Sequence, residues 1–239
     1  MKTLAKVGII LAFAAIAGGV VVRRRLHASH PPPPPHEDGR AVHVPLTSET
    51  LTLDGELTES SWHSAPVTRF VGEDGKDARP YSEVRFLWSR DGILHVGLYA
   101  SDKNIVSAGV PPDGPVWRGD SFHLVFAKDG VEHSFDIGPT DHGPVLTDGE
   151  RKSGGAWTYG WQSGARVALD MDEGTVDQPR DRDEEWVIEL NVPLASIGLA
   201  SEAGQTIEFT ARRCDLDERG GQPLELPCPS IALSLTLDP

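Results

Sequence analysis

The dipeptide Asp129-Gly130 constrains this chain more than any other feature, because it separates two runs in which apolar and polar residues alternate. An Asp-Gly pair favours a two-residue turn with positive φ at both central residues, and this turn joins antiparallel strands. The sequence therefore predicts a hairpin that begins near Ser121, turns at Asp129-Gly130 and ends near Ile137.

The alternation also predicts the register of this hairpin. If Lys128 pairs with Val131, one face is apolar, and a slip by one residue would set apolar side chains against polar ones. The other face is then polar, with His123 opposite Asp136, because cross-strand partners share a face. The residues expected on the buried face are Phe122, Leu124, Phe126, His133, Phe135 and Ile137.

The remaining segments indicate an all-β chain. A helical turn capped by Thr58 and docked by Trp62, a polar loop at 141–155 and a short helix at 195–199 interrupt the strands, and Trp88 and Trp186 are expected in the core. About ten short strands and no long amphipathic helix predict an antiparallel two-sheet β-sandwich with one or two short helices. The other expected strands are 42–46, 51–53, 67–71, 82–88, 93–100, 157–170, 186–194, 206–214 and 230–237.

The first 41 residues precede the domain at 42–239. Residues 1–25 contain an uncharged run of sixteen residues, Val7–Val22, after Lys2 and Lys6, as in an N-terminal apolar helix that serves as a signal. We expect an uncleaved anchor in the inner membrane because Arg23-Arg24-Arg25 follows the run directly, with a cleaved signal peptide as the alternative. The Pro-rich linker 26–41 is then a stiff spacer whose five prolines extend about 15 Å.

Charge and cysteine content narrow the partners. The chain has 22 basic and 36 acidic residues, a net charge of −14, which makes nucleic-acid binding improbable on electrostatic grounds. Cys214 and Cys228 are the only cysteines, and in an exported, periplasmic or envelope domain they are expected to form a disulfide. Free thiols are the alternative if the domain is cytoplasmic.

Four motifs, in order, resemble the family 9 carbohydrate-binding modules over roughly residues 42–237. They are Leu53-Asp54-Gly55-Glu56-Leu57-Thr58-Glu59-Ser60-Ser61-Trp62, the run Leu94–Asp102, Trp117-Arg118-Gly119-Asp120-Ser121, and the run Trp186–Leu194. The resemblance implies a non-catalytic β-sandwich that binds a polysaccharide or oligosaccharide, with Trp117 as a stacking residue. The chain departs from the family pattern at His123, where the family has an acid, and at 220–228, which contains no second Trp.

Five residues are candidate carbohydrate-binding residues: Trp117, Asp120, His123, Arg212 and Trp157. Sugar recognition needs a flat aromatic face for the ring and planar polar groups for the hydroxyls. For each residue a structural role is the alternative: Trp117 folded over the sandwich edge, His123 in an ion pair with Asp136, and Arg212 as an ordinary exposed charge. The stripe of Trp157, Tyr159 and Trp161 is expected in the core, with Trp157 as the exception.

Other functional classes have weaker signals. The acidic run Asp170–Gly174 offers oxygen ligands for calcium, but its spacing does not fit an EF-hand loop, so no cofactor is expected and a solvated loop is the preferred interpretation. No nucleophile elbow, phosphate loop or paired carboxylates indicate an enzyme. Two further alternatives are an envelope protein-interaction domain with a degenerate sugar site, and a haem-binding sandwich that would use Met171.

Overall fold

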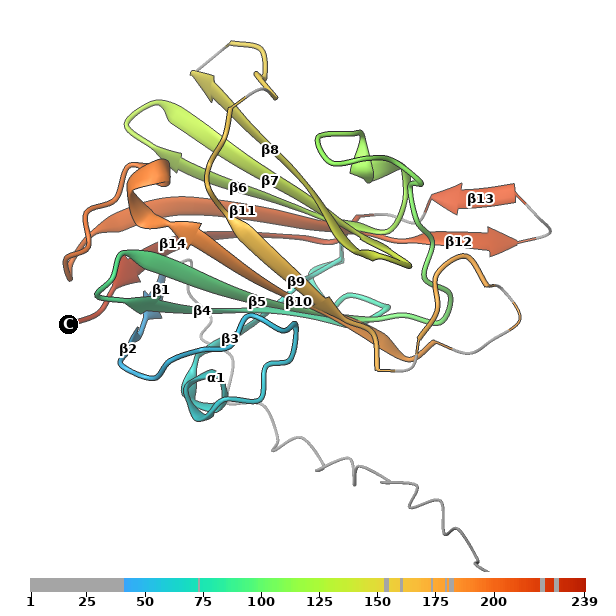
Figure 1. The fold of residues 1–239 in the computed structure, drawn as a ribbon, viewed down its shortest axis with the longest axis horizontal. Helices are drawn as coiled ribbons and strands as arrows, with labels where there is room; N and C mark the ends of the chain where they lie inside the picture. The colour runs from blue at the N-terminus through green and yellow to red at the C-terminus, as the bar shows by residue number, and fades with distance from the viewer. Residues whose placement is uncertain are drawn as a thin grey trace, which may run out of the picture. The chain divides into compact units, whose positions relative to one another are not determined.

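A computed structural model describes residues 41–239 except 73, 153–154, 160, 173, 179, 181–182, 220–221 and 226–227, with backbone alone for 217–219 and 222–225. The described residues form a β-sandwich of two six-stranded sheets, which confirms the predicted fold class. Figure 1 shows the sheets as two layers, with the small β12–β13 hairpin projecting from one end. The expected anchor at 1–25 and residues 26–40 of the expected linker lie outside the described residues, whereas Ala41, the last residue of that linker, begins a strand. Among the described residues no helix is long and apolar enough to span a membrane.

The first sheet has the order β1-β14-β11-β6-β7-β8, and the second has the order β2-β4-β5-β10-β9 with β3 beside β4. The strands of the first sheet are β1 Ala41–Val44, β14 Ser230–Leu237, β11 Thr206–Cys214, β6 Ser121–Lys128, β7 Val131–Thr140 and β8 Gly143–Lys152. Those of the second are β2 Leu46–Thr47, β3 Val67–Arg69, β4 Ser82–Ser89, β5 Ile93–Ser101, β10 Glu185–Pro193 and β9 Arg166–Asp170. Outside the two sheets lie β12 Leu216–Arg219, β13 Gln222–Glu225, α1 Ser60–Ser64, η1 Val116–Arg118 and η2 Leu194–Ile197.

The β6–β7 hairpin has the predicted register. Lys128 pairs with Val131 and His123 with Asp136, and the turn residues Asp129 and Gly130 both have positive φ. The expected buried residues of this hairpin are indeed buried, from Phe122 at 0% exposure to His133 at 7%. The hairpin therefore presents one apolar face to the other sheet and one polar face outward.

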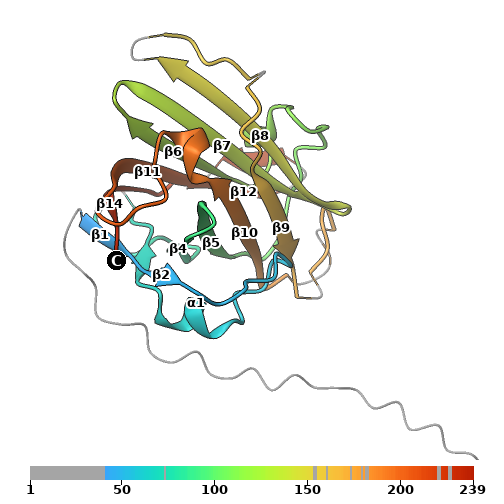
Figure 2. The ribbon, with the colours of Figure 1, turned by 60° about the vertical axis from the view of Figure 1, so that its left-hand side comes forward.

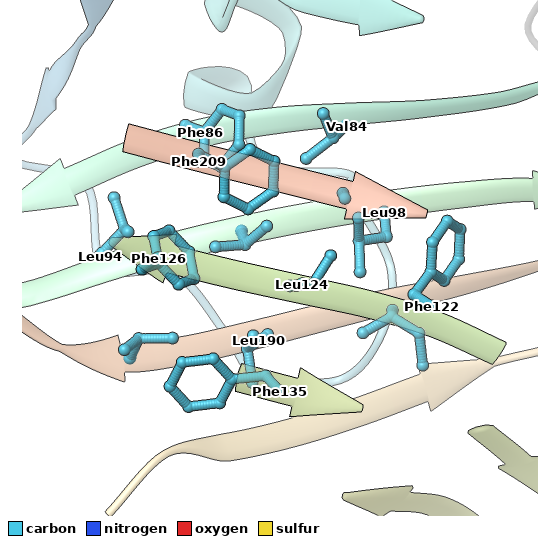
Figure 3. Packing of buried hydrophobic residues seen from close by; sticks show 14 of the residues in the cluster. Val84, Phe86, Leu94, Leu98, Phe122, Leu124, Phe126, Phe135, Leu190 and Phe209 are labelled. Atoms are coloured by element: carbon cyan, nitrogen blue, oxygen red, sulfur yellow. The ribbon is translucent and has the colours of Figure 1, made fainter. Parts of the chain in front are cut away.

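The core lies between the two sheets (Figure 3). Phe86 of the second sheet meets Phe209 of the first edge-on, with ring centroids 5.0 Å apart, and Phe122 meets Trp186 at the same distance. Trp88 and Trp186 are buried in this core as predicted, whereas Trp62 is buried in a separate small cluster with Leu87. That small cluster lies on the outer face of the second sheet, where Trp62 Nε1 donates to Glu189 Oε1 at 3.1 Å.

Several predicted element boundaries were wrong. The segment 141–155 contains β8 instead of a loop, because ten of its residues pair with β7 after a tight turn at Gly143, whose φ is 110°. Residues 51–53 are not a strand, and Leu51 packs against the small cluster that contains Trp62. Helix α1 begins at Ser60, and its N-cap is Glu59 with no side-chain cap, so Thr58 does not cap it. The expected helix at 195–199 is the 3-10 turn η2.

The chain crosses from the first sheet to the second after β8 (Figures 1 and 2). Thr158 forms an isolated bridge with Glu150 at the edge of β8, and only from Arg166 does the chain join the second sheet as β9. The single long strand expected at 157–170 is therefore two pieces. This crossing places the aromatic stripe at the open edge of the sandwich.

Candidate binding face

Trp117 stands on a loop that is fastened to the outer face of the first sheet. Thr147 Oγ1 of β8 donates to the Gly114 carbonyl at 2.6 Å, and Gly114 N–H closes a turn onto the Pro111 carbonyl at 2.9 Å. In the following 3-10 turn η1, Val116 is buried at 1% exposure while Trp117 is 48% exposed. The turn therefore uses Val116 as its anchor and leaves the indole of Trp117 on the surface.

Asp120 fixes this loop from below and does not face the surface. It is fully buried, and its two carboxylate oxygens accept from Val106 N–H at 2.7 Å and Leu216 N–H at 2.6 Å. Burial, and next the charge of Asp102, raise the pKa of Asp120 to about 8. Gly119 allows the close approach, because a Cβ there would lie 2.3 Å from Ala108 N. Asp120 is thus placed as a positioning residue.

Asp120 belongs to a buried cluster of carboxylates around an arginine. Oxygens of Asp102, Asp120 and Asp215 lie within 4.8 Å of one another. Arg213, which is fully buried, donates to Asp102 Oδ2 at 2.5 Å and pairs with Asp215 Oδ2 at 2.7 Å. The guanidinium supplies positive charge inside the cluster and holds β11 to the end of β5.

Three aromatic rings form a row along the edge strand β8. Trp117 and Tyr159 have ring centroids 6.0 Å apart, and Tyr159 and Trp157 have centroids 6.5 Å apart. Tyr159 is 37% exposed, Trp157 is partly buried, and the Arg151 guanidinium lies 4.5 Å over the Trp157 ring. We call these three rings the aromatic row.

Tyr159 was expected in the core, and its outward position has a local cause. Its ring lies over Gly149 of β8, where an added Cβ would be 3.1 Å from Tyr159 Cδ1. The bridge between Thr158 and Glu150 holds the segment at the strand edge, so that Tyr159 covers the outer side. Trp161 instead packs at the core side against His133, with centroids 4.7 Å apart. The alternation predicted that the aromatic residues of this stripe share one face. Because the chain turns around β8, Tyr159 lies on the outer side and Trp161 on the core side.

Polar side chains form a second row at right angles to the first. Register places Arg212 beside His123, His123 beside Asp136, and Asp136 beside Thr147, on four neighbouring strands. His123 Nδ1 is hydrogen-bonded to the buried carboxylate of Asp136, and Arg212 is exposed. This arrangement, the polar row, begins under the loop of Trp117 and presents an oriented imidazole and a guanidinium to the outside.

Of the candidate residues, Trp117, Trp157, His123 and Arg212 therefore lie on the outer face of the first sheet. Sequence reasoning missed Tyr159, Gly149 and Arg151 as parts of this face. The alternation from Thr147 through Gly149 to Arg151 was a usable signal, but it lay inside a segment taken for a loop. The predicted disulfide between Cys214 and Cys228 is present, at the end of β11.

A depression of about 550 Å³ lies elsewhere, on the outer face of the second sheet. His95 at its floor is hydrogen-bonded through Nε2 to Ser89 Oγ at 2.9 Å and through Nδ1 to Asn191 Oδ1 at 2.7 Å. Its lining includes Glu49, Arg90 and Arg166 but no Phe, Tyr or Trp. It therefore lacks the flat apolar surface that stacking on a sugar ring requires.

Among the described residues, the acidic run Asp170–Gly174 does not bring its carboxylates together into a possible calcium site. The carboxylates that do lie close together are those of Asp102, Asp120 and Asp215. Glu173 lies outside the described residues. Met171, considered above for haem, packs partly buried against the core.

Comparison with known proteins gives a structural neighbour and no family. No protein-family model matches the chain, and no curated protein matches it. A solved structure from Bacteroides uniformis, named a "putative carbohydrate-binding protein", has a TM-score of 0.61 and 12% identity, over 84% of this chain and 100% of that chain. The resemblance to family 9 thus stays a prediction. What the similarity establishes is that this chain shares its β-sandwich fold with that protein.

Proposed function

We propose that the outer face of the first sheet binds carbohydrate without catalysing a reaction on it. The observation that carries this proposal is the pairing of Trp117 and Tyr159. Among the described residues these are the large hydrophobic side chains that are exposed, and their rings are neighbours. Adjacent exposed rings mark an interaction surface when the other large apolar side chains of the described residues are buried or partly buried, and flat rings suit the apolar face of a pyranose.

The polar row supplies the hydrogen bonds that stacking alone lacks. Asp136 orients the imidazole of His123, and Arg212 offers guanidinium N–H donors beside it. Fixed planar donors and acceptors beside an apolar surface are typical of small-molecule sites. The proposed contact residues are therefore Trp117, Tyr159, Trp157, His123 and Arg212, and Asp120 holds the loop in place. The name of the Bacteroides uniformis neighbour supports the same function.

The test is a glycan-array screen followed by calorimetric titration of the hits. Trp117→Ala is expected to lower affinity at least roughly ten-fold, because it removes the most exposed ring. Arg166→Ala, on the outer face of the second sheet, is the matched control and is expected to bind as the natural chain does. If no glycan binds and envelope proteins are captured instead, with capture lost in Trp117→Ala, the face is a protein-interaction surface and the proposal is wrong.

We also infer that the domain is exported and tethered to a membrane by its N-terminal segment. The apolar run Val7–Val22, the five prolines Pro31–Pro35 and the disulfide between Cys214 and Cys228 support this inference. Fractionation of cells with thiol labelling is the measurement. Membrane-bound protein whose cysteines react only after reduction agrees with the inference, and soluble protein with freely reactive cysteines contradicts it.

A further inference from the structure

We propose that the aromatic row binds the interior of an extended glycan chain along its length, and does not clamp a chain end. This inference rests on the proposed carbohydrate-binding function. It concerns the manner of binding and the class of ligand: a chain of pyranoses whose ring faces are apolar and flat, as in gluco- or xylo-configured sugars with equatorial substituents.

The row follows β8. The Trp117 loop is bonded to Thr147, the Tyr159 ring lies on Gly149, and the Trp157 ring lies against Arg151. These three strand residues are successive outward positions, and two residues of a strand advance about 6.6 Å. The ring spacings of 6.0 and 6.5 Å match this advance. The strand edge therefore acts as a template that sets the spacing of the rings.

The spacings are too short for a clamp. A pyranose held between two rings needs contact distance on both faces, roughly 7–8 Å between the ring planes. The centroid distances are smaller than this, and the planes of neighbouring rings differ by only 35° and 29°. Tyr159 lies on Gly149 and Trp157 lies on Arg151, so these two rings cover the outer side of β8 as a floor for successive sugars, and the row supplies no pair of walls around a terminal sugar.

The polar row adds direction to this floor. His123 and Arg212 lie at the Trp117 end of the aromatic row. The reason is that Thr147 is part of the polar row and also holds the Trp117 loop through a hydrogen bond. At the Trp157 end Arg151 is already paired with Glu132. Hydroxyl recognition is therefore concentrated on the sugar over Trp117, and the next two sugars are held by stacking. Affinity should then grow with chain length up to three units.

The decisive experiment measures how many protein molecules bind each chain. The probes are a soluble β-glucan and a soluble xylan of defined chain length, with cellohexaose, xylohexaose and their borohydride-reduced forms. Interior binding predicts several proteins per polymer chain, a hexaose affinity changed less than two-fold by reduction, and weaker binding of disaccharides. One protein per polymer chain, or loss of hexaose binding on reduction, would overturn the inference while leaving carbohydrate binding intact.

Variants test whether the aromatic row causes the dependence of affinity on chain length. Trp157→Ala is expected to weaken the hexaose roughly ten-fold and the disaccharide less than two-fold, because the disaccharide reaches only Trp117 and Tyr159. Trp117→Ala should weaken both, and Arg166→Ala neither. Equal loss for hexaose and disaccharide in Trp157→Ala would overturn the proposed order of the rings. Absence of binding to every probe would overturn this inference, and the glycan-array screen decides separately whether the proposed function fails with it.

Discussion

The position of Tyr159 in the aromatic row depends on Gly149, which has no side chain. Gly149 is buried beneath Tyr159, and an added Cβ would meet Ser134 Oγ at 3.0 Å and two carbons of the Tyr159 ring at 3.1 and 3.3 Å. Such contacts are tighter than ordinary van der Waals packing, so the ring has to move. A methyl group at this position tests whether the row needs Tyr159 in place.

Gly149→Ala is expected to lower glycan affinity roughly five-fold while costing about 1 kcal/mol of stability. Gly72→Ala is the control, since its Cβ would meet nothing closer than Asp74 Oδ1 at 3.4 Å. Calorimetric titration measures the affinity, and denaturant unfolding measures the stability. Unchanged affinity in Gly149→Ala would show that Tyr159 takes no part in binding.

At the scale of single residues, the sequence predicted the features that follow from the alternation of apolar and polar residues. The pairing of His123 with Asp136 followed from the register of the hairpin, and the exposure of Trp117 agrees with the stacking role that the resemblance implied. Asp120 did not, because its burial depends on two backbone N–H groups, of Val106 and Leu216, that are distant in sequence. No local pattern distinguishes a carboxylate that binds a ligand from one that fastens a loop.

At the scale of elements, two backbone hydrogen bonds fasten the segment that carries Trp157 and Tyr159 to β8. Thr158 N–H donates to the Glu150 carbonyl at 2.8 Å, and Glu150 N–H donates back to the Thr158 carbonyl at 3.1 Å. Residues 141–155 were predicted to be a loop because Gly and charged residues have low strand propensity. An edge strand such as β8 tolerates them, since only one side of it is paired with another strand.

Thr158→Pro is expected to weaken glycan binding roughly ten-fold, because proline removes the N–H that holds this segment. Thr158→Ala keeps the N–H and serves as the control. Hydrogen exchange of the Glu150 and Thr158 amides in the natural chain locates the bridge in solution. Equal binding by both variants would mean that the bridge does not position the rings.

The disulfide closes the end of β11 onto the chain that leads into β14. Cys214 and Cys228 are 14 positions apart, and a loop of this length contributes about 3 kcal/mol when closed. Replacing both cysteines with serine is expected to lower the free energy of unfolding by that amount and to change glycan affinity less than two-fold. A large loss of affinity with unchanged stability would contradict a purely structural role.

The whole molecule combines an apolar interior with buried acids. Glu189 lies under the segment that carries Trp62, where its carboxylate accepts from Asp54 and Gly55 N–H at 2.9 Å each. Burial raises the pKa of Glu189 to about 7, although the hydrogen bonds from Gly55 and Asp54 act against the rise. With Asp120 at about 8, two acids bind protons more tightly in the folded than in the unfolded chain.

Stability is therefore expected to fall as pH rises. An acid whose pKa is higher in the folded than in the unfolded chain stabilises the fold fully at any pH below its unfolded pKa. This stabilisation is lost as the pH rises to its folded pKa. Burial lowers the pKa of His95 and His133. These two residues change the stability only at a pH below their ordinary pKa of 6.5, so they do not affect the slope above it. Between pH 6.5 and 8 the free energy of unfolding should thus fall by about 2 kcal/mol.

Denaturant unfolding at several pH values measures this slope. Asp120→Asn should flatten the slope and lower stability at pH 6.5, because the amide NH₂ faces one of two backbone donors. Glu189→Gln is the second variant, for use if Asp120→Asn does not fold. Stability that is constant or rises over this range in the natural chain would show that these carboxyl groups are charged in the fold.

The pairing of β1 with β14 has a mechanical consequence. The two strands run parallel, with Ala41 beside Ser234 and Val44 beside Leu237. The leading end of β1 and the trailing end of β14 therefore point to opposite ends of one hydrogen-bonded ladder. Tension between the two ends of the domain slides these strands past each other, so the bonds share the load and do not open one after another. A domain with this geometry resists unfolding by a force applied between its two ends.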